Sequence, residues 1–299
     1  MKIVNTMGGL GNQMFQCAFA LTLQNYFPEE DVMIDVSHFN YLFFKKIGAA
    51  NLHNGYEIDR VFPNANFKKA TPWQLLKVTW YMPNYFLSRA VRKVFPAKKS
   101  EFIVAEHENF SFIEEALKIN GDCYYEGVWE SISYYLPIKD EIQRIYAHPE
   151  PNDINAEYIA AMESANSVGI HVRRGDYLKE PSFRGICELD YYREAIKQVL
   201  SDGLNHTFYV FSNDKNWCEK NLLELLDGNK VIFVTENFGP NSCWDMFLMT
   251  HCLDLIIANS SFSWWGAFLN KRGGRVFAPS KWTNREAEHD VWAPNWIKI

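Results

Sequence analysis

The sequence predicts an α/β protein whose second half is a doubly wound parallel sheet. Short apolar runs rich in β-branched residues recur through that half, which is typical of strands buried on both faces. Segments with the apolar spacing of helices separate these runs, and polar residues follow every run directly. The predicted strands are 168–170, 208–211, 231–234, 255–258 and 276–278.

Helical spacing fills the intervals between the predicted strands. Trp244, Phe247, Leu248, His251 and Leu255 supply one apolar stripe at i, i+3, i+4, i+7 and beyond. Strands that alternate with helices of this length predict βαβ units and hence a parallel sheet. The other predicted helices are 191–200, 217–226 and 264–270.

The first half follows the same rhythm more loosely. A strand, a glycine-rich turn at 8–11 and an amphipathic helix at 13–27 open the chain, whereas residues 37–100 fit no single pattern. The segment Pro149 to Asp153 is typical of a hinge. We therefore expect two domains, 1–153 and 154–299, with a C-terminal tail that packs back on the first. The predicted strands of this half are 2–5, 32–36, 102–105 and 124–129.

Composition and charge exclude some classes of function. The net charge of −6 argues against general nucleic-acid binding. Residues 60–100 carry nine basic residues and no acidic one, so the rest of the chain carries −15. This stretch, in which aromatic residues are interleaved with the basic ones, has two interpretations. It rests on an anionic membrane surface, or it is a solvated face balanced by acids elsewhere, which is the commoner case.

Cysteine usage and the N-terminus bear on location. The six cysteines are scattered without a Cys-x-x-Cys pair, a pattern that suits free thiols in a reducing cytosol. The N-terminus reads as a short strand that runs into glycines, not as a signal peptide, and no apolar run approaches a membrane span. We expect a cytoplasmic protein, either soluble or peripheral on the inner membrane.

An arginine pair carries the clearest chemistry. His171, Arg173, Arg174 and Asp176 follow the predicted strand 168–170. Arginine suits bidentate binding of phosphate oxygens and stays charged. A diphosphate leaving group gains negative charge as its bond to a sugar breaks, so fixed arginines would stabilise that transition state. The alternative is a structural ion pair between an arginine and Asp176.

Two further polar segments end at the same predicted edge. Ser and Asn side chains before the helix at 264–270 predict an anion site with the free N–H groups of the helix start, although ordinary N-capping would explain one serine. After strand 208–211, Asn213 and Asp214 suit a nucleoside base or ribose, or an Asx turn. The residues of the first segment are Asn259, Ser260, Ser261, Phe262 and Ser263.

Metal and dinucleotide chemistry receive little support. The sequence has no Asp-x-Asp, no His-Glu-x-x-His and no zinc-like Cys/His spacing, so we expect neither metal nor cofactor. Gly8-Gly-Leu-Gly11 is not a dinucleotide fingerprint. Its glycines serve a tight turn, or they let the backbone approach a sugar or phosphate.

Taken together, these segments resemble the motifs of the α-1,2-fucosyltransferases, glycosyltransferase family 11. The resemblance implies a GT-B-like fold with two Rossmann-like domains facing a cleft. It also implies GDP-β-L-fucose as donor, inversion at the anomeric carbon without a metal, and O2 of a terminal galactose of a glycan as acceptor. In the absence of a membrane anchor before these segments, the sequence resembles the bacterial members of the family. The matching segments are 8–16, 171–177, 189–192, 212–214 and 259–267.

The resemblance also implies roles for individual residues. Arg173 and Arg174 would serve the β-phosphate with His171 beside them, Asp214 with Asn213 would bind guanosine, and 259–263 would bind the diphosphate. Gly11, Asn12 and Gln13 would line the fucose side of the site. Gly127-Val-Trp-Glu-Ser131 departs from the family's Gly-Tyr-Trp-Gln-Ser, which leaves acceptor contacts at Trp129 and Glu130 open.

Three alternatives stay open from the sequence. His171, Asp176 and Glu130 are candidates for a general base, and a phosphate oxygen of the leaving group is another proton acceptor. The donor could be a different nucleotide sugar, or the acceptor a different hydroxyl. The ten tryptophans also fit a non-catalytic carbohydrate-binding protein.

Overall fold

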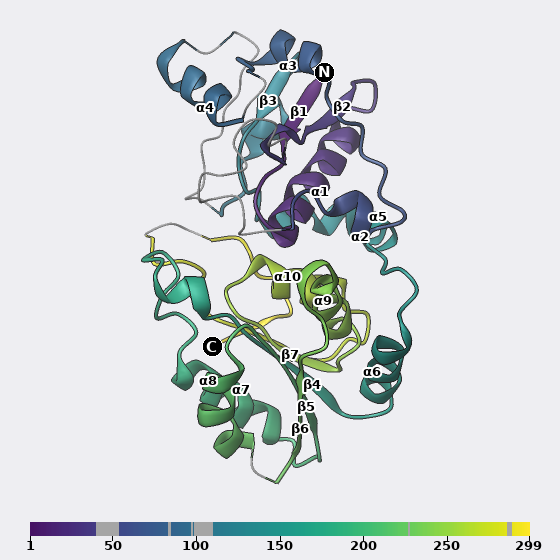
Figure 1. The fold of residues 1–299 in the computed structure, drawn as a ribbon, viewed down its shortest axis with the longest axis vertical. Helices are drawn as coiled ribbons and strands as arrows, with labels where there is room; N and C mark the ends of the chain where they lie inside the picture. The colour runs from purple at the N-terminus through teal and green to yellow at the C-terminus, as the bar shows by residue number, and fades with distance from the viewer. Residues whose placement is uncertain (40–53, 83–84, 97, 99–109, 227, 286–288) are drawn as a thin grey trace. The chain divides into compact units, whose positions relative to one another are not determined.

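The structure is a computed structural model that describes the chain except for residues 40–53, 83–84, 97, 99–109, 227 and 286–288. The chain divides into two compact units (Figure 1). Unit 1 comprises Met1–Ala147 and Ala287–Val291, and unit 2 comprises His148–Glu286 and Trp292–Ile299. The predicted strand at 102–105 lies outside the described residues.

Unit 1 is built on a small parallel sheet with the order β2-β1-β3. The strands are β1 (Lys2–Asn5), β2 (Val32–Asp35) and β3 (Cys123–Tyr125), and Ile3 is in register with both Met33 and Tyr124. Helix α1 (Leu10–Tyr26) follows β1 and buries Phe15 and Phe19 completely. The strand predicted over 124–129 is too long, because the backbone leaves the extended conformation and reaches φ +60° at Trp129.

Short helices account for most of the described part of 37–100. Helix α3 begins with a capping box, in which Thr71 and Gln74 satisfy each other's backbone N–H groups. Its buried residues Leu75 and Val78 join the core formed by Ile3, Met33 and Tyr124. The helices of unit 1 after α1 are α2 (Ile58–Val61), α3 (Pro72–Val78), α4 (Tyr85–Val94) and α5 (Lys139–Ile145).

Unit 2 contains the predicted parallel sheet, which is confirmed with the order β6-β5-β4-β7-β8-β9. The chain runs outward from β4 to β6 and then returns to the other side of β4, so the order switches between β4 and β7. Ligands of such sheets bind at this switch point, beyond the carboxyl ends of the strands. The strands are β4 (Ser167–Val172), β5 (Thr207–Ser212), β6 (Lys230–Val234), β7 (Asp254–Ile256), β8 (Val276–Ala278) and β9 (Ile297–Lys298).

Helices cover both faces of this sheet. Val168, Ile170 and Val172 alternate along β4 and pack in one core with residues of α7 and α8. On the opposite face a Cβ at Gly169 would lie 2.7 Å from the Cδ2 of Leu255 in β7 and 3.1 Å from the Cys252 sulfur, so a larger residue there would displace the Leu255 side chain. The helices of unit 2 are α6 (Asp153–Glu163), α7 (Leu189–Leu200), α8 (Lys215–Asn221), α9 (Cys243–Met249) and α10 (Ser261–Leu269).

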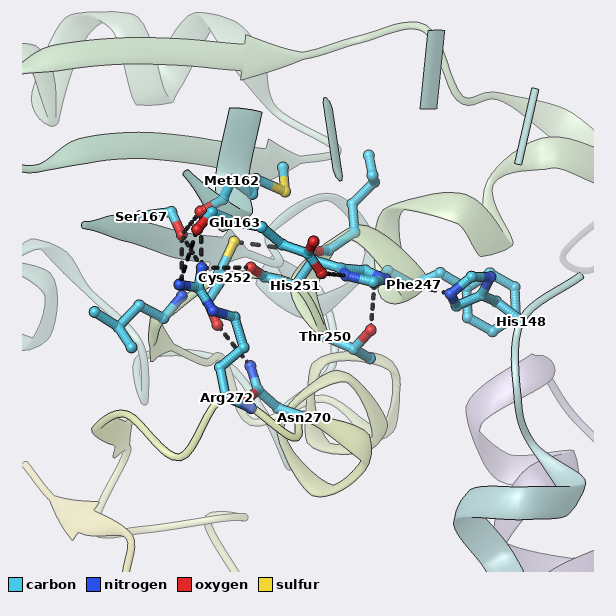
Figure 2. Close-up of polar contacts among 12 residues, drawn as sticks. His148, Met162, Glu163, Ser167, Phe247, Thr250, His251, Cys252, Asn270 and Arg272 are labelled. Carbon is cyan, nitrogen blue, oxygen red and sulfur yellow. Dashed lines mark hydrogen bonds and ion pairs between the residues drawn. The ribbon is translucent and has the colours of Figure 1, made fainter. Parts of the chain in front are cut away.

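Helix α9 ends at Met249, before the end of its apolar stripe, and Leu255 lies in β7, within the strand predicted at 255–258. Two side chains from after α10 bind the carbonyls where α9 ends (Figure 2). Asn270 donates to the Met249 and Cys252 oxygens at 3.3 and 2.8 Å, and Arg272 donates to the His251 oxygen at 3.1 Å. These bonds satisfy carbonyls that another helical turn would otherwise use.

Candidate functional site

Arg174 is the most tightly held residue after β4. Its guanidinium lies 4.2 Å over the ring of Trp217 and forms ion pairs with Glu188 at 3.4 Å and Asp214 at 3.5 Å. Its backbone N–H donates to the Asn213 side-chain oxygen at 3.0 Å. With a side chain only 14% exposed, Arg174 ties the loop after β4 to the loop after β5.

Arg173 is held much more loosely. It forms an ion pair with Asp176 at 2.9 Å, and its guanidinium lies 5.4 Å from the ring centroid of Tyr177. The Arg173 side chain is 34% exposed, and its Nε has no hydrogen-bond partner among the residues that the structure places. Arg173 does form the structural ion pair considered from the sequence, and because its Nε is a buried atom, like that of Arg174, only the exposed part of the Arg173 side chain is accessible to an anion.

Gly175 makes the close approach of the two loops possible. Its φ is +31°, and a Cβ there would lie 2.5 Å from the Nδ2 of Asn213. A larger residue would therefore push Asn213 away from the backbone of Arg174. Asn213 thus holds the loop 173–176 after β4, which we call the arginine loop.

Asp214 acts as an N-cap and still faces the arginine. One carboxylate oxygen accepts the Trp217 N–H at 3.1 Å at the start of α8, while the other lies 3.5 Å from the Nε of Arg174. Asp214 therefore caps α8 through the N–H three residues on, and does not form the Asx turn considered from the sequence, which would use the N–H two residues on. Its side chain remains 34% exposed.

The segment 259–263 divides into structural and accessible groups. Asn259 is buried, accepts from the Cys187 thiol at 3.4 Å and donates to the Trp282 oxygen at 3.2 Å. Ser263 is also buried and donates to the Ala258 oxygen at 3.3 Å. Ser260, the residue before α10, makes no side-chain cap, so the N–H groups that open this nine-residue helix lack that partner.

His171 connects the arginine loop to the start of α10. Its ring centroid lies 5.8 Å from that of Phe262, and its backbone oxygen accepts the Tyr192 hydroxyl at 3.1 Å. Burial, with the nearby Arg173 charge, lowers the pKa of His171 to about 3. The ring is therefore neutral at pH 7, and its Nδ1 has no partner among the described residues.

The predicted residues of the first unit are largely buried. Gln13 donates to the oxygens of Gly8 and Gly55 at 3.0 and 2.8 Å and accepts the Glu57 N–H at 2.8 Å, so its amide organises the glycine turn. Gly11 is buried and Asn12 is half-buried beside that turn. The Asn12 amide nitrogen lies 3.1 Å from the position of a Cβ on Gly8, whose φ is +81°.

Trp129 occupies a strained position in the same unit. Its φ is +60°, a conformation costly for a bulky residue, and its ring stacks on Phe19 at 3.9 Å. Its indole N–H is buried without a partner in the described part of the chain, and Glu130 beside it is also buried. Strain of this kind is held by surrounding structure and often marks a functional loop.

Two contributors to the arginine site escaped sequence reasoning. Glu188 and Trp217 hold the Arg174 guanidinium, one by charge and one by its ring face. The position of Trp217 in the first turn after Ser-Asn-Asp was the available signal. Within the described ranges, no group of three or more His, Cys, Asp or Glu is placed to hold a metal. Nor is any described helix long and apolar enough to cross a membrane.

Comparison with known families decides what kind of protein carries this site. The model of glycosyl transferase family 11 matches residues 2–299. The chain belongs to this family. This glycosyltransferase is 31% identical to an α-1,2-colitosyltransferase from Escherichia coli over 99% of the chain and 98% of that protein. It is 28% identical to the O-antigen biosynthesis glycosyltransferase WbnK, also from Escherichia coli, over 98% of each.

More distant relatives agree with this assignment. A galactoside α-(1,2)-fucosyltransferase 1 from Lagothrix lagotricha is 30% identical over 44% of the chain and 38% of that protein. Among solved structures, the fucosyltransferase NodZ from Bradyrhizobium superposes with a TM-score of 0.50 at 12% identity, covering 90% of this chain and 92% of NodZ. A FUT1 variant from Arabidopsis thaliana in complex with GDP gives 0.50 at 12% identity, covering 93% and 69%. The predicted GT-B-like α/β fold of this glycosyltransferase is therefore confirmed.

Proposed function

We propose that this glycosyltransferase transfers L-fucose from GDP-β-L-fucose to O2 of a terminal galactose of a glycan, with inversion and without a metal. The arginine loop at the switch point of the second sheet carries the proposal. In it, Arg174 is fixed by three partners, while Arg173 has a single ion pair, with Asp176, and a side chain that is 34% exposed. Residues 154–299 would bind the donor, and residues 1–153 would bind the acceptor.

The diphosphate would be neutralised by the protein itself. Arg173 and Arg174 supply two permanent charges, and the start of α10, where Ser260 makes no side-chain cap, would add the positive end of a helix dipole. Negative charge grows on the β-phosphate as the bond to fucose C1 breaks, so these groups bind the transition state more strongly than the ground state. The Asp214 carboxylate would accept hydrogen bonds from guanosine, and the Asn213 amide would donate to it.

The acceptor hydroxyl would attack C1 from the face opposite GDP and lose its proton. A pKa of about 3 makes His171 a weak base, which favours a positioning role for it beside the phosphates. Asp176 and Glu130 remain the carboxylate candidates, and an oxygen of the departing phosphate is the third. Gly11, Asn12, Gln13 and Trp129 would shape the fucose and acceptor side.

A second donor deserves a direct test because of one relative. The α-1,2-colitosyltransferase matches the chain over nearly its whole length. Colitose is the 3-deoxy form of L-fucose, so a site that binds the 3-hydroxyl would discriminate strongly against it, whereas an apolar site would accept both. The alternative function is therefore colitosyl transfer from the corresponding GDP-sugar.

The deciding experiment measures GDP release from GDP-fucose with lactose as acceptor, with and without EDTA, followed by linkage analysis. We expect a fucosyl-α-1,2-galactose product and equal rates with the chelator. Transfer of glucose from UDP-glucose but not of fucose would contradict the donor assignment, and chelator sensitivity would contradict the metal-free mechanism. A GDP-colitose arm decides between the two deoxy sugars.

A matched variant tests the non-catalytic alternative. If the chain is a non-catalytic carbohydrate-binding protein, Arg173→Ala should leave its sugar affinity unchanged, and the wild type should release no GDP. The control is Arg193→Ala, which removes an exposed arginine paired with Asp190 on α7, with 51% and 93% exposed side chains. We also propose that the enzyme works in the cytoplasm.

A further inference from the structure

Helix α4 turns its polar side inward. Ser88 is buried, and its hydroxyl accepts the Met82 N–H at 2.8 Å and donates to the Met82 oxygen at 3.0 Å. One turn later, Arg92 has a side chain only 3% exposed, pairs with Glu126 at 3.2 Å and lies 4.4 Å from the ring centroid of Tyr124. Among the side chains of α4 that the structure describes, the contacts of Ser88 and Arg92 with the rest of unit 1 are therefore largely polar.

The apolar side of α4 consequently faces solvent. Leu87 is 48% exposed, Val94 78% and Phe95, the next residue, 53%. A surface helix of a globular protein normally buries its apolar stripe and exposes its charges. The inverted arrangement calls for a partner that covers these side chains.

Helix α3 extends the same apolar surface. Trp73 is 81% exposed, the most exposed large hydrophobic side chain among the described residues, and Leu76 is 38% exposed. Lys98 donates to the Leu76 oxygen, and the Trp80 ring lies 5.7 Å from that of Phe95. These contacts place the end of α3 beside the end of α4, and both helices lie at one end of unit 1 (Figure 1).

Lysines border this surface. Lys77 is 70% exposed and pairs only distantly with Asp122, at 3.5 Å, while Lys93 is exposed and makes no ion pair with any described residue. Arg89, 38% exposed, shares Glu126 with Arg92. Apolar and aromatic side chains with lysines at their border suit the interface of an anionic bilayer. There, aromatic side chains enter the headgroup layer and lysines contact lipid phosphates.

We propose that the surface formed by Trp73, Leu76, Leu87, Val94 and Phe95, with Lys77 and Lys93 at its border, docks on an anionic phospholipid bilayer. We call it the α3–α4 surface. A second copy of the chain is a poorer occupant, because a two-fold contact through this surface would set the lysines of one copy against those of the other. The inference goes beyond the transfer reaction and would bring the enzyme to acceptors carried on lipids.

Vesicle cosedimentation tests the proposal with the full-length protein. We expect binding to phosphatidylglycerol-containing vesicles, weak binding to pure phosphatidylcholine, and loss of binding at high salt. The double variant Lys77→Gln/Lys93→Gln should lower the partition coefficient about thirty-fold, from roughly 1 kcal/mol per lysine near the surface. The triple variant Leu87→Ser/Val94→Ser/Phe95→Ser should lower it on the order of a hundred-fold.

Matched controls separate docking from misfolding and from failure of the proposed function. Ile154→Ser/Leu204→Ser/Leu223→Ser removes three comparably exposed side chains of unit 2 and should bind vesicles like the wild type. All variants should keep their melting temperature and their activity on soluble lactose. Brominated lipids should quench wild-type fluorescence more than that of Trp73→Phe.

Three outcomes would overturn the proposal. Equal binding to neutral and anionic vesicles, or binding that the triple variant retains, excludes the α3–α4 surface as the lipid contact. A wild-type dimer that the triple variant converts to a monomer, without vesicle binding by either, identifies a second copy as the occupant. Light scattering on the same samples reads that result.

Discussion

Replacing Arg173 isolates a guanidinium that contributes little to the fold. Its ion pair with Asp176 is exposed, 34% and 52% for the two side chains, so it is worth about 0.2–1 kcal/mol after solvent screening. If Arg173 instead binds the diphosphate in the transition state, its loss removes about 2.7–4 kcal/mol, which corresponds to roughly 10²–10³ in kcat/KM. Activity and stability should therefore separate at this position.

The assay compares kcat/KM for GDP release with the melting temperature of each variant. Arg173→Ala should lose about 10²–10³ in kcat/KM with an unchanged melting temperature, and Arg173→Lys should lose less, because lysine keeps the charge without the bidentate geometry. Arg174→Lys should lose both activity and stability, since three partners hold that side chain. A kcat/KM of Arg173→Ala within threefold of wild type would refute the reasoning. So would a loss that follows the melting temperature.

Three other predictions follow from single contacts. Gly175→Ala should weaken GDP binding and cost about 1 kcal/mol of stability, because φ is +31° and the new Cβ would displace Asn213. Burial raises the pKa of Asp245 to about 7, so the folded state holds a proton that the unfolded state releases above about pH 4. The stability of the protein therefore falls as the pH rises from about 4 to about 7. In urea titrations, Asp245→Asn should stabilise the protein by about 2 kcal/mol at pH 8 and by little at pH 4.5. Arg272→Met should cost about 2–3 kcal/mol, because this charged donor binds carbonyls from two elements as well as a serine hydroxyl (Figure 2).

The predictions for Gly175 and Arg272 each have a control variant, and the one for Asp245 is checked by comparing two pH values. Gly203→Ala meets the same backbone penalty at φ +71° with nothing within 4 Å, so it should leave GDP affinity unchanged. Arg193→Ala, on the exposed side of α7, should change the unfolding free energy by less than about 0.5 kcal/mol. Equal stabilisation by Asp245→Asn at both pH values would contradict the buried-proton account.

The sheet of unit 2 was predictable because its signals are local. Each strand carries its own apolar run, and the structure extends β4 only to Ser167–Val172 around the predicted 168–170. Strand β9 was missed because Ile297–Lys298 has two residues and no run. It forms by pairing with β8, and next to it the Ile299 N–H donates to the Ala278 oxygen at 2.9 Å. Pairing with a distant strand cannot be recognised from the local sequence.

Features that depend on distant side chains were not predictable. The apolar stripe of α9 continues in sequence to Leu255, but Asn270 and Arg272 end the helix at Met249 from about twenty residues away. In the candidate site, the sequence predicted the residue types and the ends of the strands. It did not predict that Arg174 would be fixed by several side chains and Arg173 by a single exposed ion pair. That difference depends on where Trp217 and Glu188 place their side chains.

The division of the chain limits how the two halves can be exchanged between family members. The polypeptide leaves unit 2 at residue 286, contributes 287–291 to unit 1 and returns to form β9. In unit 1, Ser131 donates to the Asp290 carboxylate at 2.6 Å, so the returning segment carries a contact of its own. A chimera with one junction near 147 would give unit 1 a foreign Asp290 segment. Exchange of whole units requires three junctions. A chimera that keeps the Ser131–Asp290 hydrogen bond within one parental sequence would show that its junctions respect the two units.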